Sequence, residues 1–343
     1  MSGEARLSLF YLIVVLAFYT ALVCVGVPPI QPDAIAGNAI VYAATWFLIA
    51  SAGCLRELAR SRPEAPIRHL RHTVFGATFR RRGLETWPLF LLAVVFMAAF
   101  SEMKSAIPLF HEYSWDQSFI DLDRSLHGQD PWRLLQPILG YPVITSLISI
   151  AYQLWLLLIY AGTLYFALYV DDRKLRVRYF SAFFGIWTIN GVVLAIIFAS
   201  VGPCFVGPLL GNAHYADQMA YLHRANAFFP VMTLDVQQQL LAWKTDGSHG
   251  LGRGITAMPS MHVSLAFLSY LAMRQHSRTL GRIFLAFLII IMVGSVHLGY
   301  HYAIDGYVSI VTTAIIWMLC GSRSGAPLGK MKSLFRAPIA RPL

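Results

Sequence analysis

Residues 284–320 read FLAFLIIIMVGSVHLGYHYAIDGYVSIVTTAIIWMLC, two apolar runs joined by a short polar segment. Each run is close to the length of about 20 residues that a helix needs to cross a bilayer. The polar segment contains His297, His301 and Asp305. Titratable side chains are costly in hydrocarbon, so a cluster where one span ends and the next begins indicates a functional site at one membrane face.

The composition of the whole chain agrees with a membrane protein. Of its 343 residues, 57% are hydrophobic and 13% are charged, and the mean hydropathy is +0.58. A water-soluble core cannot bury that much apolar surface. We therefore predict an all-α fold, a polytopic membrane helix bundle. The formal charge of +10 arises mostly beside apolar runs, which is typical of orientation signals and does not indicate nucleic-acid binding.

Eight apolar segments predict about eight transmembrane helices. They lie at roughly 8–27, 34–54, 87–103, 142–170, 179–200, 259–273, 283–300 and 306–320. The first could instead be a signal peptide, but it is long for one and no A-x-A cleavage site follows it. We expect four parts: two N-terminal transmembrane helices in 1–55, a basic cytoplasmic loop at 56–86, a six-helix catalytic core at 87–320 and a basic cytoplasmic tail at 321–343.

Basic loops set the expected orientation. Residues 56–82 carry eight arginines against two glutamates, and 171–178, 274–282 and the C-terminal tail are also basic. These segments fall on one side of an eight-helix count, and short basic loops stay in the cytoplasm. We predict cytoplasmic termini in a bacterial inner membrane, with the active site on the periplasmic face.

Two long segments, 104–141 and 201–258, fall on the opposite side and are rich in aromatic, Pro and Gly residues. Such segments can form short amphipathic helices at the interface, and long ordered loops usually carry function. We expect the four aspartates of the first segment to be solvated; they are Asp116, Asp121, Asp123 and Asp130.

The second long segment ends in GRGITAMPSMHVS, residues 252–264. It places His262 at the same membrane face as His301 and Asp305. If helical, His301 and Asp305 share one face, so the carboxylate can orient the imidazole. Glycine, arginine and serine residues at a helix N-terminus favour phosphate. An imidazole nucleophile with a second imidazole as acid predicts phosphoryl transfer.

These residues resemble the type 2 phosphatidic acid phosphatase superfamily of membrane phosphoesterases, which carries PSGH and SR-x5-H-x3-D motifs. The first appears here as Pro259-Ser260-Met261-His262, and the second survives as His301 and Asp305. The resemblance implies that His301 attacks phosphorus, that Asp305 orients it, and that His262 protonates the departing alkoxide.

The chain departs from the family pattern in its phosphate-binding residues. Gly294 and Ser295 stand where the family has Ser-Arg, and no intact K-x6-RP motif is found. Segments ASVGPCFVG, AMPSMH and HYAID look like the branch that contains fungal inositol phosphorylceramide synthase. Candidate phosphate or substrate ligands are Ser260, Arg253, Gly254, Lys104 and His297. Arg253 could replace the missing arginine, Lys104 could bind phosphate or snorkel to headgroups, and His297 could support His301.

The function predicted from these features is a membrane lipid phosphotransferase that moves a phosphoryl-linked headgroup through a phosphohistidine. Its partners would be a phospholipid donor and a lipid hydroxyl or water acceptor. A lipid phosphate phosphatase is the alternative, because water and alcohol attack use the same base. A transporter or scaffold is the alternative of another class, although no internal repeat is evident and the titratable groups do not lie at the midplane.

We expect no cofactor and no metal. The four cysteines show no ligand spacing. A histidine nucleophile, an arginine and a helix N-terminus can supply what a divalent ion would otherwise do. A haem held by two histidines would need neither the Pro-Ser sequence nor the aspartate.

Overall fold

The computed structural model describes residues 3–28, 32–246 and 252–322, and every regular element within them is a helix. Seven helical segments are long and apolar enough to cross a membrane. They are α1 (Gly3–Cys24), α2 (Pro32–Ser61), α4 (Ala77–Phe110), α7 (Pro142–Leu168), α8 to α9 (Arg173–Ile197), α14 (Arg278–His297) and α15 (Ala303–Ser322). The predicted all-α membrane bundle is confirmed. The basic tail expected at 321–343 lies almost wholly outside the described residues.

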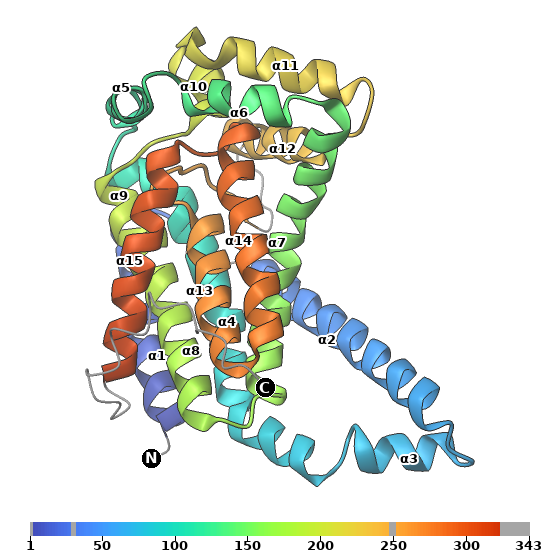
Figure 1. Ribbon diagram of the computed structural model, residues 1–343. Helices are drawn as coiled ribbons and strands as arrows, with labels where there is room; N and C mark the ends of the chain where they lie inside the picture. The colour runs from blue at the N-terminus through green and yellow to red at the C-terminus, as the bar shows by residue number, and fades with distance from the viewer. Residues whose placement is uncertain (1–2, 29–31, 247–251, 323–343) are drawn as a thin grey trace.

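The eighth expected span, 259–273, corresponds to α13 (Met261–His276), which has only 16 residues. It contacts α7, α8, α14 and α15 and lies inside the bundle (Figure 1). Ser260 caps its N-terminus, since the Ser260 hydroxyl accepts a hydrogen bond from the backbone N–H of Val263. A helix enclosed by other helices does not need the full length of a lipid-exposed span.

The segment expected as a basic loop at 56–86 is largely helical. α2 continues to Ser61, α3 (Pro66–Thr73) follows, and α4 begins at Ala77, before its apolar run. Arginine is a good helix former, so a helix can continue beyond the apolar run that hydropathy detects.

Short helices cover one end of the bundle (Figure 1). They are α5 (Asp116–His127), α6 (Pro131–Leu139), α10 (Pro203–Leu210), η2 (Ala213–Tyr215), α11 (Ala216–Asn226) and α12 (Met232–Asp246). We call these helices the cap, and the opposite end of the bundle the base. The two long segments therefore contain the short helices expected from the sequence.

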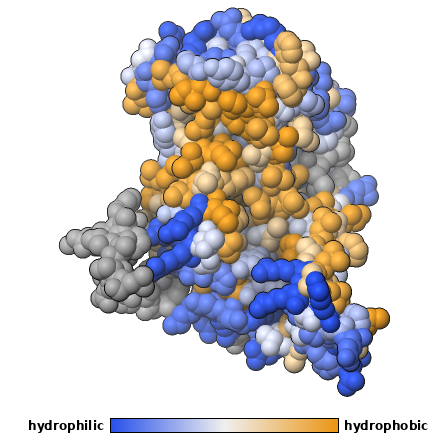
Figure 2. Space-filling model, turned by 45° about the vertical axis from the view of Figure 1, so that its right-hand side comes forward, coloured by the Kyte–Doolittle hydropathy of each residue, from blue (hydrophilic) through white to orange (hydrophobic). Residues whose placement is uncertain are grey.

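On the face that Figure 2 shows, the surface of the middle of the bundle is hydrophobic, and it lies between a hydrophilic cap and a hydrophilic base. Most of the long helices run roughly along one direction between these two ends (Figure 1). They therefore pass through this hydrophobic region. This distribution is that of an integral membrane protein.

The two N-terminal helices join the bundle differently. α1 packs against α4 and α8, and its buried Glu4 forms ion pairs with Arg173 at 2.6 Å and Arg176 at 3.2 Å. α2 touches α4 and α7, and its second half diverges from the bundle (Figure 1). Its buried residues are Asn38, Tyr42, Thr45 and Ala50. The part of α2 that packs into the core therefore ends near Ala50.

Candidate active site

A cavity of about 470 Å³ lies between the cap and the bundle. Its volume is within the range of about 300–1,000 Å³ that is usual for small-molecule sites. Residues of α2, α4, α7, α8, α10, α12 and α13 line it, together with the segment before α13 and the one before α15. Both predicted histidines, His262 and His301, are among the lining residues.

His301 is held by hydrogen bonds on one side of its ring. Its Nδ1 lies 2.8 Å from the carbonyl oxygen of Ala257 and 3.3 Å from Oδ2 of Asp305. Both partners are acceptors, so Nδ1 carries the ring proton and Nε2 has the free electron pair. Nε2 lies 3.4 Å from Nδ1 of His262. Asp305 is itself oriented, because its Oδ2 accepts a hydrogen bond from the backbone N–H of Tyr302 at 3.0 Å.

His262 is clamped between two aromatic rings of α7. The ring centroid of Trp155 lies 4.0 Å from that of His262, and Tyr152 stacks on the imidazole at 4.3 Å with an interplanar angle of 24°. Tyr300 stacks in turn on Tyr152 at 5.2 Å. Residues three apart on a helix share a face, which is how Tyr152 and Trp155 reach the same ring. The clamp fixes the plane of the imidazole.

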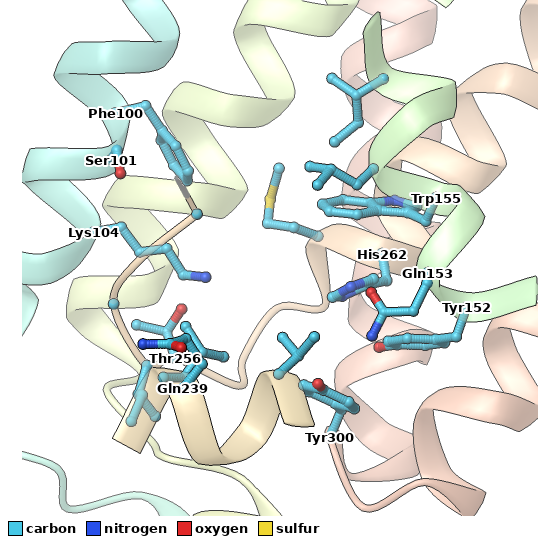
Figure 3. A pocket seen from close by; sticks show the side chains of 18 of the residues that line it. Phe100, Ser101, Lys104, Tyr152, Gln153, Trp155, Gln239, Thr256, His262 and Tyr300 are labelled. Carbon is cyan, nitrogen blue, oxygen red and sulfur yellow. The ribbon is translucent and has the colours of Figure 1, made fainter. Parts of the chain in front are cut away.

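Lys104 extends from α4 into the cavity, on the side opposite His262 (Figure 3). Within the described part of the chain, no carboxylate lies within ion-pair distance of Lys104. Gly254 lies directly against the backbone of this residue: a Cβ at Gly254 would lie 2.8 Å from the Lys104 carbonyl carbon, and its φ is +94°. Only glycine therefore lets the segment before α13 approach α4 so closely.

The structure places three of the predicted ligands outside the cavity lining. Arg253 forms an ion pair with Glu102 and lines a neighbouring cavity of about 230 Å³. The Ser260 hydroxyl is fully buried as the cap of α13. His297 is also buried, and its Nε2 lies 2.9 Å from the hydroxyl of Thr145. Lys104 is thus the cation that faces the histidines, and Arg253 is neutralised by its own partner.

Two carboxylates of α5 hold the backbone around His301. Asp116 accepts hydrogen bonds from the N–H groups of Val201 and Gly202 at 3.0 Å and from the Tyr302 hydroxyl at 2.7 Å. Asp123 accepts from the N–H groups at the start of α15, those of Ala303 at 2.7 Å and Ile304 at 3.0 Å. Hydrogen bonds to charged acceptors contribute about 1.5–3 kcal/mol each, so these contacts fix the segment that carries the nucleophile candidate.

The expectation that the aspartates of segment 104–141 are solvated is wrong for three of the four. Asp116, Asp123 and Asp130 are 3%, 1% and 7% exposed, and Asp121 is exposed as expected. Burial raises the pKa of the Asp123 carboxyl, while its two N–H donors lower it. Asp116 and Asp123 are seven residues apart and therefore share one face of a helix, which is the signal that could have identified both.

Sequence reasoning also missed most of the polar cavity lining. These residues are Ser101, Gln153, Asp235, Gln239 and Thr256. They come from four different parts of the chain, and each is unremarkable in its local sequence. A few convergent polar groups in an otherwise apolar cavity are typical of a site that orients a ligand.

No group of three or more His, Cys, Asp or Glu side chains in the described residues has an arrangement that could hold a metal ion. The site therefore consists of two facing imidazoles, a carboxylate behind one of them and a lysine across the cavity. Such a site at one end of a helical membrane bundle belongs to the class of integral membrane proteins that handle phosphate esters.

The chain is a member of the PAP2 superfamily, whose family model matches residues 117–319. No curated protein and no solved structure gave a significant match. The matched region begins in α5 and ends in α15, so it includes both histidines and Asp305 but not α1, α2 or α4. Membership indicates phosphoryl chemistry, as a phosphatase or a phosphotransferase, and does not favour a transporter or scaffold. Lys104 lies outside the matched region.

Proposed function

We propose that this protein is a lipid phosphotransferase that moves a phosphoryl-linked headgroup through a phosphohistidine on His301. One observation carries the proposal: Nδ1 of His301 is tied to Ala257 and Asp305, which leaves Nε2 unprotonated beside His262. An imidazole fixed in this tautomer by a carboxylate is an activated nucleophile.

In the first step, Nε2 of His301 attacks the phosphorus of the donor lipid. A P–N bond forms, the P–O bond to the lipid alkoxide breaks, and its electron pair goes to the alkoxide, which takes a proton from His262. The positive charge that develops on His301 is stabilised by Asp305. Lys104 neutralises the phosphoryl oxygens, as oriented cations do in phosphoryl-transfer sites.

In the second step, the acceptor hydroxyl gives its proton to His262, which is now neutral. The acceptor oxygen attacks phosphorus, and the P–N electron pair returns to Nε2 of His301. The AMPSMH and HYAID segments support an alcohol acceptor through their likeness to the inositol phosphorylceramide synthase branch. Aromatic lining supports it too, because apolar walls limit the access of water.

The proposal includes an orientation in a bacterial inner membrane. The basic residues of α3 and of the first turns of α4 lie at the base, and short basic segments stay in the cytoplasm. The cap and the cavity would then face the periplasm, with both termini in the cytoplasm. A cysteine introduced at exposed Gln117 of the cap should react with a membrane-impermeant maleimide in intact cells, and one at Arg68 should not.

The test is to incubate the purified protein with phospholipids labelled in the headgroup, with and without diacylglycerol or ceramide. Mass spectrometry would follow the label and free phosphate. We expect a labelled new lipid only when the acceptor is present, and no product with His301→Ala. Release of phosphate or phosphorylated headgroup regardless of acceptor would make the protein a hydrolase. Full activity of His301→Ala would exclude both reactions at this site.

A further inference from the structure

The cavity continues from the histidines towards the middle of the bundle. On α7 its lining extends from Tyr152 to Tyr160, which corresponds to about 12 Å at a rise of 1.5 Å per residue. The residues along this part are apolar or aromatic: Met97, Phe100, Trp155, Leu156, Ile159 and Trp187. Figure 3 shows Phe100 and Trp155 on opposite sides of the space. We call this part of the cavity the apolar arm.

The apolar arm ends at a polar contact between α2 and α7. The Tyr160 hydroxyl donates a hydrogen bond to Oδ1 of Asn38 at 2.9 Å, and Nδ2 of Asn38 donates to the Ala34 carbonyl at 2.8 Å. Asn38 is 2% exposed and still belongs to the cavity lining. Tyr42 packs edge-to-face on Tyr160 at 4.7 Å and supports the contact from behind. Asn38 is the only lining residue from α2.

The dimensions of the apolar arm fit a hydrocarbon chain. A bilayer core is about 30 Å thick, so one leaflet contributes about 15 Å, slightly more than the length of the arm. A chain attached to a phosphate at His301 would run along α7, in the direction of chains in the surrounding leaflet. To pass beyond the end, it would have to separate Asn38 from Tyr160 and leave buried polar groups without partners, which is unfavourable.

We propose that the apolar arm binds one hydrocarbon chain of the lipid substrate, and that Asn38 of α2 limits the length of the chain that fits. The proposal rests on the proposed function, because it assumes that the phosphate attached to this chain is the one that His301 attacks. Since α2 lies outside the region matched by the family, this limit is a property of the present chain that the shared catalytic residues do not determine.

Binding is measured first, because it does not require turnover. Lysophosphatidic acids with a terminal bromine and acyl chains from butanoyl to octadecanoyl are titrated into the full-length protein in detergent micelles. Bromine quenches nearby tryptophan, and the contribution of Trp155 and Trp187 is the difference from a Trp155→Phe/Trp187→Phe variant. We expect affinity to rise with chain length and then level off where the chain reaches Asn38.

Variants at the end of the apolar arm should move that limit. Asn38→Leu fills the end and should weaken binding of the long chains about tenfold, the size of effect that one methylene can have in a hydrophobic pocket, and leave the butanoyl compound unchanged. Asn38→Ala should move the limit to longer chains. Thr45→Leu is the matched control, because Thr45 is buried on the same face of α2 but is not part of the cavity lining.

A loss that is equal for all chain lengths, or an unchanged profile in both Asn38 variants, would overturn the proposal. Thermal unfolding of each variant shows whether an equal loss comes from misfolding. If it does, Asn38→Gln, which keeps the amide, replaces the misfolded variant in the titration. If the wild type binds long chains with a length limit but converts none of them, the proposed function fails and the binding inference stands.

Discussion

The two ends of the bundle both carry charged side chains, but they use them differently. At the base, opposite charges pair: Glu4 with Arg173 and Arg176, and Arg82 with Asp171. At the cavity, Lys104 faces two imidazoles, and the α5 carboxylates Asp116 and Asp123 bind backbone N–H groups instead of cations. The comparison indicates that the charges of the base hold helices together, while the positive charge at the cavity is left for a ligand.

Substitution of His262 should give the largest effect and therefore tests most directly the difference between the cavity end and the base. His262→Gln should reduce turnover of lipid phosphate esters by about 10³-fold, since general acids contribute about 10²–10⁴-fold. The loss should be much smaller with p-nitrophenyl phosphate, because nitrophenolate departs without a proton. Steady-state rates on both substrates check this. An equal loss on both would show that His262 has another role.

Lys104 should have the next largest effect. Lys104→Met should lower kcat/KM by about 10²-fold, as removal of one transition-state charge partner does in other sites, and Lys104→Arg should recover part of the activity. The matched control is the double variant Glu102→Gln/Arg253→Gln, which removes the neighbouring cation together with its partner. A larger loss in the control than in Lys104→Met would make Arg253 the phosphate ligand.

The backbone contacts of Asp123 should have an intermediate effect. Asp123→Asn keeps the shape but can accept only one of the hydrogen bonds from Ala303 and Ile304, at a cost of about 1–2 kcal/mol. We expect turnover to fall about tenfold with a lower unfolding temperature. Asp121→Asn, on the exposed face of the same helix, should match the wild type in both measurements. Unchanged turnover in Asp123→Asn would mean that the cap does not position His301.

The base should show the smallest effect on catalysis. Glu4→Gln leaves the buried guanidinium of Arg176 without its nearest charge partner, and loss of one member of a buried pair costs about 3–5 kcal/mol. The unfolding temperature should fall, while kcat/KM measured below it stays within about twofold. Glu64→Gln, which removes an exposed carboxylate between α2 and α3, should change neither. A catalytic loss in Glu4→Gln at full stability would remove the distinction between the two ends.

The sequence predicts the spans and the histidine motifs well, because both are local signals. Apolar runs report where the chain meets lipid, and motif spacing places His262, His301 and Asp305 at helix ends. The choice between Lys104 and Arg253 is not local. Glu102 and Lys104 are two apart and point to nearly opposite sides of α4, so one of these sides receives Arg253 and the other faces the cavity. Which side is which depends on how α4 packs.

Other site residues depend on tertiary structure in the same way. Tyr152 and Trp155 look like ordinary aromatic residues of a span until α13 places His262 between them. The role of Asn38 depends on α2 leaning against α7, and no pattern within α2 indicates its partner Tyr160. Burial of Asp116 could have been suspected from its spacing to Asp123, but its three donors come from segments about 85 and 186 residues further along the chain.

That long separation also sets the order in which the protein can be completed. Chains are made from the N-terminus, so Asp116 is synthesised long before Gly202 and Tyr302. Until Tyr302 and the start of α15 are in place, neither Asp116 nor Asp123 has all of its donors, and the His301 segment lacks its contacts with α5. A nascent chain that stops before α15 therefore contains all the other described helices but no assembled site. The site can therefore assemble only after α15 has been made and inserted.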